Sequence, residues 1–283
     1  MARNATSPYD QCVAAAVELV ERETHAEARA RSRIFDIPID LGRPDELLRR
    51  IARWAASRDG GPPRRVMYAN AHVLNQSAEN AELRDALESA DLVYCDGYGV
   101  RLAAKALERP VPHRMTGADW IWGLAALCEH TGESIYLLGS EPAVARQAAA
   151  RLSATFPGLE VVGTHHGYFE PGSAHDDRVV EDINARRPSI VLVGMGTPKQ
   201  ELWVQRNAER LDVDVLWTVG ALFDVVSGKV PRAPGWLADN GLEWIFRLAI
   251  EPGRMWRRYL LGNPVFVHRV RRARARNGHA PPA

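Results

Sequence analysis

The sequence predicts an α/β fold: a mostly parallel, Rossmann-like sheet with helices on both faces, followed by a basic helical appendage at the C-terminus. Two observations predict the sheet. Short apolar runs alternate with segments of helical periodicity, which is typical of parallel strands joined by helices. The runs are apolar throughout, as expected of strands covered on both faces. The predicted strands are Val66–Ala69, Leu92–Cys95, Ile135–Leu138, Leu159–Val162, Ile190–Val193 and Val215–Val219.

The helical segments and the two ends of the chain define the predicted domains. Ala118–His130 and Pro142–Phe156 show helical periodicity between predicted strands. Residues 1–32 are rich in Ala, Arg and Glu, and we interpret them as a flexible or helical extension. Residues 33–240 contain no Gly/Ser linker and form one predicted α/β core. Residues 241–283 form a predicted amphipathic, basic appendage and tail.

The composition is that of an ordinary globular protein. Of 283 residues, 46% are hydrophobic and 25% charged, and the net charge of +1 gives no overall attraction to a polyanion such as nucleic acid. Three scattered cysteines without C-x-x-C spacing argue against a disulfide framework or a structural zinc site and fit a reducing cytoplasm. No apolar run approaches the roughly 18 to 20 residues of a spanning helix, and we expect no signal peptide.

Polar and glycine residues follow the predicted strands at their carboxyl ends. Open α/β sheets bind their ligands at this edge, so we expect the functional site there. The stretches concerned are Asn70 with His72, Asp96-Gly97-Tyr98-Gly99, Gly139-Ser140, Gly194–Glu201 and Gly220–Asp224.

Three positions near this edge each have two interpretations. Asp96 is either the N-cap of the following helix or a general base beside glycines that let a substrate approach the backbone. In Gly194–Glu201, Lys199 replaces the third glycine of a dinucleotide-binding fingerprint, so a dinucleotide cofactor is disfavoured. The segment predicts either a plain strand–helix turn or a helix N-terminus that binds a phosphate or sugar hydroxyl through Lys199 and Gln200. Arg114 is either a surface charge or a bidentate diphosphate contact.

Two patterns suggest a metal site and are discounted. Asp212 and Asp214 match the D-x-D pattern, but they precede a predicted strand and so lie at the amino edge of the sheet. His165 and His166 are adjacent on an extended chain, where neighbouring side chains face opposite ways, and no nearby Cys, Asp or Glu completes a ligand set. We therefore expect no metal site and interpret the histidines as part of a surface or gating loop.

The C-terminal region interleaves aromatic and aliphatic side chains with arginine. Eight arginines and no acidic residue occur from Arg254 to Arg276. Such a segment can be a docked helix with a basic tail or a nucleic-acid patch. Because the aromatic residues recur among the arginines at helical spacing, we favour an interfacial helix that rests on anionic lipid.

Seen in order, the short motifs form a specific set. They are Asn70-Ala71, Asp96-Gly97-Tyr98-Gly99, Arg114-Met115-Thr116-Gly117, Gly194–Glu201, Gly220–Asp224, Arg232-Ala233-Pro234 and Gly241-Leu242-Glu243-Trp244. In this order they resemble the WecG/TagA/CpsF family of bacterial glycosyltransferases, over most of the chain from about Arg33 to Leu261. The combination of G-x-G-x-P-K-Q-E, R-A-P and G-L-E-W is the most specific part of the resemblance.

The resemblance implies a metal-independent, inverting transfer of N-acetylmannosamine or a related sugar from a UDP-sugar donor. The implied acceptor is a polyprenyl-diphosphate-linked sugar, used in cell-surface polysaccharide synthesis. Asp96 is the implied general base. The implied substrate-binding residues are Asn70, Gly97, Arg114, Thr116, Gly139, Gly196, Lys199, Gln200, Asp224, Arg247, Arg254 and Arg257.

Within that set, the resemblance places Asn70, Arg114 and Gln200 in the donor pocket. It places the C-terminal arginines over the diphosphate near the membrane. We accordingly expect no cofactor, no nucleic-acid partner, and a cytoplasmic protein bound peripherally to the inner face of the cell membrane. A homo-oligomer is left open.

Two other functions compete with this one. A non-catalytic module that binds a sugar nucleotide or nucleic acid would use the same basic tail and release no UDP from any donor. A nicotinamide-dependent oxidoreductase is disfavoured by the incomplete glycine pattern.

Overall fold

The computed structural model describes residues 30–57, 60–234, 236–237 and 240–277, so nearly all of the expected N-terminal extension lies outside the described residues. The chain divides into two compact units, each built from separate segments. Among the segments described, the first unit holds residues 43–66 and 117–229, and the second holds residues 30–42, 67–116 and 230–277. The predicted domains, residues 1–32, 33–240 and 241–283, are consecutive segments, whereas these two units interleave along the chain. The predicted domain boundaries therefore stay a prediction.

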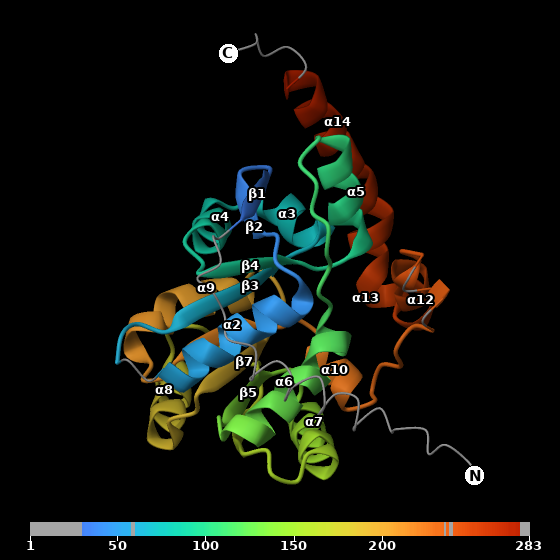
Figure 1. The fold of residues 1–283 in the computed structure, drawn as a ribbon. Coiled ribbons are helices and arrows are strands. Elements are labelled where there is room, and N and C mark those ends of the chain that lie inside the picture. The colour runs from blue at the N-terminus through green and yellow to red at the C-terminus, as the bar shows by residue number, and fades with distance from the viewer. Residues whose placement is uncertain (1–29, 58–59, 235, 238–239, 278–283) are drawn as a thin grey trace, which may run out of the picture. The chain divides into compact units, whose positions relative to one another are not determined.

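The main sheet has six strands in the order β4-β3-β8-β7-β5-β6 (Figure 1). The β3–β8, β8–β7, β7–β5 and β5–β6 ladders are all parallel, which confirms the predicted fold class. All six predicted strands are present. The strand predicted at Leu159–Val162 lies further along the chain and begins at Val161. The strands are β3 (Arg64–Ala69), β4 (Leu92–Cys95), β5 (Ile135–Gly139), β6 (Val161–His165), β7 (Ile190–Gly194) and β8 (Val215–Thr218).

In the first unit, helices cover both faces of β5 to β8. The chain moves outward from β5 to β6 and then back through β7 to β8, so right-handed crossovers put α7 on one face and α8 and α9 on the other. The two predicted helices are confirmed as α6 and α7. The helices are α2 (Pro44–Ser57), α6 (Gly117–Thr131), α7 (Pro142–Thr155), α8 (Ala174–Arg186), α9 (Lys199–Asn207) and α10 (Leu222–Val226), with a 3₁₀ turn, η1 (Ala208–Arg210).

The core of the first unit is apolar and closely stacked. Trp120 of α6 lies parallel to Trp217 of β8, with ring centroids 3.8 Å apart, and both side chains are buried. Trp203 of α9 is also fully buried. Large aromatic rings each bury more apolar surface than any aliphatic side chain, so these contacts fix α6 and α9 on the sheet.

The second unit contains a hairpin that the sequence analysis missed, formed by β1 (Arg31–Ile34) and β2 (Ile37–Asp40). Phe35 and Asp36 form its turn with φ values of 51° and 68°. Such turns normally carry Asn-Gly or Asp-Gly, so Phe-Asp provides no turn signal. The remaining elements are α3 (Ala71–Ser77), α4 (Ala81–Glu88), α5 (Tyr98–Ala106), α12 (Glu243–Ile250), α13 (Pro252–Trp256), the π-helical turn η2 (Arg257–Leu261) and α14 (Gly262–Asn277).

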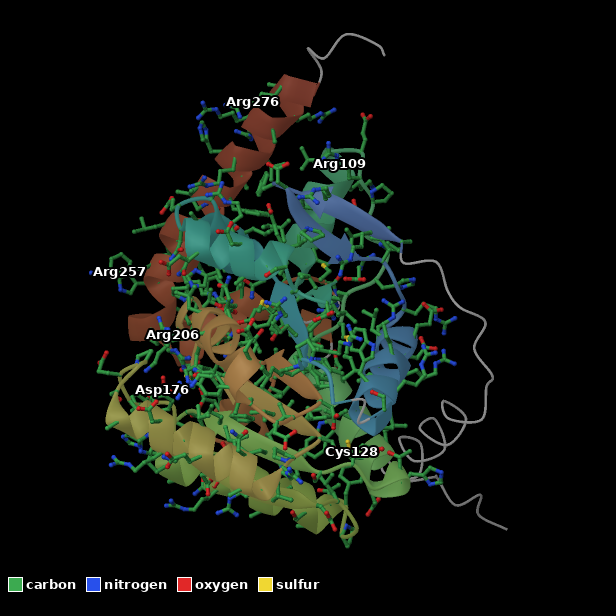
Figure 2. The ribbon with its side chains drawn as sticks, turned by 90° about the vertical axis from the view of Figure 1, so that its left-hand side faces the viewer. Arg109, Cys128, Asp176, Arg206, Arg257 and Arg276 are labelled. Atoms are coloured by element: carbon green, nitrogen blue, oxygen red, sulfur yellow. The ribbon has the colours of Figure 1, made fainter. Side chains whose placement is uncertain are left out.

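The C-terminal helices pack against the rest of the second unit. Asn75 of α3 donates a hydrogen bond to the carbonyl of Gly262 at 2.8 Å, and the buried Phe266 of α14 meets the edge of Phe35. Arg257 and Arg276 project outward from these helices (Figure 2). Among the described residues, none of the helices has the combined length and apolar character that crossing a bilayer requires.

Candidate active site

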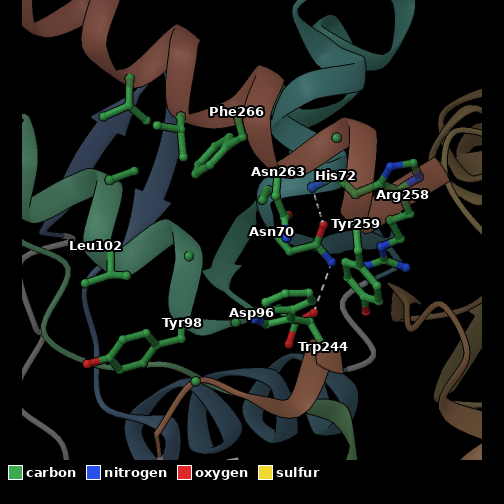
Figure 3. A pocket seen from close by; sticks show the side chains of 18 of the residues that line it. Asn70, His72, Asp96, Tyr98, Leu102, Trp244, Arg258, Tyr259, Asn263 and Phe266 are labelled. Carbon is green, nitrogen blue, oxygen red and sulfur yellow. Dashed lines mark hydrogen bonds between the residues drawn. The ribbon is translucent and has the colours of Figure 1, made fainter. Parts of the chain in front are cut away.

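A cavity of about 580 Å³ lies in the second unit, beyond the carboxyl ends of β3 and β4 (Figure 3). Residues from α3, α5, α12, η2 and α14 complete its wall. The predicted edge of the sheet therefore does carry a cavity, and the C-terminal helices contribute to it.

Asn70 and Asp96 lie at the base of the cavity, each directly after its strand. Asn70 caps α3, because its Oδ1 accepts hydrogen bonds from the backbone N–H groups of His72 and Val73. That leaves its Nδ2 to donate to Asp96 Oδ2 at 3.2 Å. The N-cap of α5 is Gly97, with φ of 95° and no side-chain cap, so the capping interpretation of Asp96 is wrong. Asp96 is instead a carboxylate held toward the cavity.

The surroundings of Asp96 favour a carboxylate that can accept a proton, chiefly through burial. Burial raises the pKa of Asp96 above its usual value, and the nearby Glu243 carboxylate raises it further. The Asn70 hydrogen bond, Arg258 and Arg247 act in the opposite direction. Because a general base works best with a pKa near the working pH, this raised pKa suits proton abstraction.

Two arginines present hydrogen-bond donors that the described part of the chain does not use. The Nε and Nη2 atoms of Arg247 and the Nε atom of Arg258 are buried without a hydrogen-bond partner there. Arg247 Nη2 is 3.8 Å from Glu251 Oε2, close enough for an ion pair but too far for a hydrogen bond. Buried donors without partners cost stability, so a ligand with phosphate oxygens would be well accommodated here.

The neighbouring His72 is neutral at physiological pH. Burial, and then the positive charge of Arg258, lower the pKa of His72 to about 4. Its Nε2 lies 3.0 Å from Gln76 Nε2, one turn further along α3. A neutral imidazole adds no further positive charge beside the two arginines.

The opposite wall of the cavity is mostly apolar, although Arg271 and Arg274 of α14 also line the cavity. It is lined by Leu102, Ala103 and Ala106 from α5 and by Phe266, Val267 and Val270 from α14. Leu102 and Val267 remain 54% and 47% exposed, so this wall continues to the protein surface. The cavity thus has a charged end, at Asp96 and Arg258, and a mostly apolar wall that reaches the surface (Figure 3).

Some of the predicted substrate-binding and catalytic residues of the second unit line the cavity, and others do not. Thr116, Arg254 and Arg257 do not line it. Arg254 donates to Glu251 at 3.2 Å, and the exposed Arg257 lies over the Trp256 ring at 5.2 Å. As substrate contacts these three stay a prediction. The predicted residues that line the cavity are Asn70, Asp96, Gly97, Arg114 and Arg247.

Several residues that line the cavity were not predicted from the sequence. Glu243 and Trp244 lie inside the G-L-E-W motif, so the motif itself could have indicated them. Arg258 was missed in favour of Arg257, because the π-helical turn Arg257–Leu261 changes which side chains share a face. No sequence pattern marks such a turn.

The other predicted residues belong to the first unit and follow β5, β7 and β8. Gly139 must be glycine, because a Cβ there would lie 2.2 Å from the carbonyl oxygen of Gly194. Lys199 donates to the carbonyls of Gly167 and Phe169 at 2.9 and 2.6 Å. Asp224 accepts a hydrogen bond from Ser140 at 2.8 Å.

Gln200 is fully buried and connects two glycine-containing loops of the first unit. Its Oε1 accepts hydrogen bonds from the N–H groups of Gly196 and Gly220, and its Nε2 donates to Glu201 at 2.7 Å. The backbone N–H of Gln200 donates to the carbonyl of Gly196, so it is not free for a ligand. Gln200 therefore shapes the loops after β7 and β8. Direct substrate contact by Gly139, Gly196, Lys199, Gln200 and Asp224 stays a prediction.

The D-x-D pair lies where the sequence analysis expected it. Asp212 and Asp214 directly precede β8, at its amino end. The exposed Asp212 is paired with Arg187 at 3.0 Å, and the backbone carbonyl of Asp214 accepts a hydrogen bond from Arg64 N–H. This position is opposite to the strand ends at which α/β sheets bind their ligands.

Comparison with known proteins points to one family. The profile of the glycosyl transferase WecG/TagA/CpsF family matches residues 32–280. An N-acetylglucosaminyldiphosphoundecaprenol N-acetyl-beta-D-mannosaminyltransferase of Bacillus spizizenii is 32% identical over 206 residues, which cover 72% of this chain and 77% of that protein. A protein of the same name from Staphylococcus aureus is 28% identical over 209 residues, which cover 74% of this chain and 80% of that protein.

Proposed function

The chain belongs to the WecG/TagA/CpsF family of glycosyltransferases, and from this premise we propose that it transfers N-acetylmannosamine or a related sugar from a UDP-sugar to a polyprenyl-diphosphate-linked N-acetylglucosamine. The product would serve cell-surface polysaccharide synthesis. The observation that carries the proposal is the cavity of the second unit, which joins the half-buried carboxylate of Asp96 and two arginines to a mostly apolar wall.

In the proposed reaction, Asp96 acts as general base. The acceptor hydroxyl loses its proton to the Asp96 carboxylate while its oxygen bonds to the anomeric carbon of the donor sugar. The bond from that carbon to the UDP oxygen breaks, and the electron pair leaves with UDP, which inverts the configuration. The raised pKa of Asp96 and its hydrogen bond from Asn70 support this role, since the first provides basicity and the second fixes the carboxylate.

The amphipathic cavity supports a lipid diphosphate as part of the acceptor. Arg247 and Arg258 offer buried guanidinium donors of the kind that bind phosphate oxygens. The apolar side chains of α5 and α14 line the opposite wall of the same cavity and extend to the surface, where a prenyl chain would leave the protein. A sugar nucleotide alone has no apolar tail to occupy this wall.

We further propose that the C-terminal helices rest on the membrane that holds this acceptor. Exposed apolar side chains lie next to arginines there, which favours an anionic lipid surface. The side chains concerned include Trp256, Leu260, Leu261 and Val265, which are 41% to 56% exposed.

We propose that transfer needs no metal ion. Arginine donors can stabilise the phosphate charge of the leaving group, which is the task of a divalent ion in metal-dependent enzymes. The D-x-D carboxylates lie at the amino end of β8, where ligands of such sheets do not bind.

The proposal is tested by measuring UDP release from a set of UDP-sugars, with a short prenyl-diphosphate-linked N-acetylglucosamine as acceptor and EDTA present. We expect release that depends on the acceptor and survives EDTA. Absence of release with every donor would instead favour the non-catalytic binding module. Strict dependence on Mn²⁺ would contradict the metal-independent mechanism.

The role of Asp96 is tested with Asp96→Asn, which keeps the shape of the side chain but cannot accept the proton. We expect transfer to fall by at least about a hundredfold, the usual effect of losing a general base. Asp85→Asn, an exposed position of α4, is the matched control and should leave transfer unchanged. Near-normal turnover of Asp96→Asn would remove Asp96 as the base.

Arg257 and Arg258 offer a direct comparison of neighbouring arginines. Arg258 lines the cavity, whereas Arg257 is exposed and stacks on Trp256. We expect Arg258→Gln to raise the KM for the lipid acceptor more than Arg257→Gln does. A larger rise in KM for Arg257→Gln than for Arg258→Gln would favour Arg257 as the substrate contact, as the family resemblance implies.

A further inference from the structure

We propose that His165, His166 and His175 form a binding site for a divalent transition-metal ion such as Zn²⁺ in the first unit. One ring nitrogen from each histidine lies within 4.8 Å of the other two. Among the described residues, no other group of three His, Cys, Asp or Glu side chains meets this condition. The inference is independent of the proposed transfer reaction, because these histidines lie at the end of β6, in the loop that follows it and in α8.

The structure here corrects an interpretation made from the sequence. His165 and His166 were set aside because no Cys, Asp or Glu nearby completes a ligand set. The third ligand is instead another histidine, His175, the second residue of α8. The chain reverses direction between β6 and α8, which brings His175 back to the pair.

The spacing of the nitrogens suits a tetrahedral ion. His175 Nε2 and His165 Nε2 are 3.2 Å apart. Zn–N bonds of about 2.0 to 2.1 Å at a tetrahedral angle place two ligand nitrogens about 3.3 to 3.4 Å apart, so this pair already has the required separation. The His166 ring lies 4.4 Å from the His165 ring and 5.3 Å from the His175 ring, centroid to centroid. It is only partly buried, and its Nδ1 accepts a hydrogen bond from the backbone N–H of Tyr168 at 3.2 Å, which a rotation toward the other two rings would have to break.

The hydrogen bonds hold His165 in the tautomer that a metal needs. His165 Nδ1 is 2.8 Å from the carbonyl oxygen of His166, and a carbonyl can only accept, so Nδ1 carries the proton. Nε2 of His165 is then a lone pair aimed at His175 Nε2. Metal-binding histidines commonly use a backbone carbonyl in this way to fix the ring.

Without metal, His175 Nε2–H donates to His165 Nε2. A metal ion would take the place of this proton, which moves to His175 Nδ1, so that the imidazole stays neutral. Neutral imidazoles are the form that coordinates metal.

The chain between the ligands is fixed by contacts that do not involve the histidines. Lys199 donates to the carbonyls of Gly167 and Phe169. The fully buried Asp176 accepts hydrogen bonds from Gly172 N–H and from the indole of Trp203, both at 2.7 Å. The imidazoles are therefore largely positioned before any ion binds, which lowers the entropic cost of binding.

Lys199 also opposes the site, because its ammonium group repels a cation near His166. Three neutral nitrogen ligands and an open position for water still match the coordination of many zinc centres. A bound ion would connect the end of β6 to the start of α8 and restrain the loop that carries Tyr168, which is 67% exposed.

The test is Zn²⁺ titration of the full chain without a polyhistidine tag, in competition with a chromophoric chelator. We expect one ion per chain in the wild type. Because the loss of even an outer-shell partner of a metal site costs roughly 10- to 100-fold in affinity, His165→Ala and His175→Ala should each weaken binding at least about tenfold. His130→Ala, an exposed histidine at the end of α6, is the matched control and should bind as tightly as the wild type.

Two further measurements keep the test decisive. His175→Gln retains a hydrogen-bonding side chain and should fold like the wild type by circular dichroism while losing the ion, which separates coordination from folding. Co²⁺ in place of Zn²⁺ should give the intense visible absorption of a tetrahedral site, and this absorption should be lost in His175→Gln. No binding by the wild type, or unchanged affinity in both alanine variants, would overturn the proposal.

Discussion

The pH dependence of stability should reveal the buried carboxyl group of Glu201, in the first turn of α9. Glu201 is fully buried, and its Oε1 accepts hydrogen bonds from Thr197 and Gln200 at 3.1 and 2.7 Å. Its Oε2 has no hydrogen-bond partner among the described residues. Burial raises the pKa of Glu201 from 4.5 to about 7, although hydrogen bonds from Gln200, from its own backbone N–H and from Thr197 favour the charged form.

The sign of the effect follows from which state holds the proton. Below about pH 4.5, both the folded and the unfolded chain carry the proton, so the group adds no pH dependence. Between about pH 4.5 and 7 the unfolded chain releases it while the folded chain retains it, so stability falls as pH rises. One pKa unit corresponds to about 1.4 kcal/mol, so the loss is about 3 kcal/mol and is complete above about pH 7.

Glu201→Gln removes this titration and leaves a side chain of the same shape. Urea unfolding of both proteins, from about pH 4 to 8.5, gives the difference in unfolding free energy, and subtraction cancels the other groups. We expect the wild type to lose about 3 kcal/mol relative to the variant over this range. Glu209→Gln, at an exposed position of η1, is the control and should follow the wild-type curve. Parallel curves for the wild type and Glu201→Gln would refute the reasoning.

Three other predictions follow from single contacts. Trp203→Phe leaves a buried oxygen of Asp176 without its indole donor and should cost about 1 to 3 kcal/mol in urea unfolding; no loss would show that the bond is not needed. Gly139→Ala places a Cβ against a backbone carbonyl and should lower the unfolding free energy by at least about 2 kcal/mol, and a wild-type value would contradict the close approach. Arg258→Gln should raise the pKa of His72 from about 4, measured by NMR titration, because a positive charge that disfavours protonation is removed; an unchanged pKa would leave burial as the whole cause.

Much of the sheet could be predicted because its strands are buried on both faces. A short, continuous apolar run such as Ile190–Val193 is typical of a parallel strand that is covered on both faces. Strand β7 consists of this run and one further residue, Gly194. The hairpin of β1 and β2 escaped prediction because its turn, Phe35-Asp36, is held by the surrounding packing and not by turn-forming residues.

The candidate site divides in a similar way. Asn70 and Asp96 were predicted because each directly follows a strand, and the carboxyl ends of neighbouring parallel strands meet at one edge. Arg258 was not, since the π-helical turn that holds it leaves no mark in the sequence. The connection that Gln200 makes between two loops depends on residues twenty positions apart and has no local signal.

The sequence by itself determined the α/β class, the six strands of the main sheet, the family and the edge of the sheet that carries the candidate base. Each of these depends on local composition or on short ordered motifs, which a linear chain displays directly. Only the tertiary structure decided that Arg247 and Arg258 present unused donors in one cavity, that its opposite wall is mostly apolar, and that His175 joins His165 and His166. These features arise where segments distant in sequence pack together. They are defined by burial and by contacts between segments, which no single segment of the sequence displays.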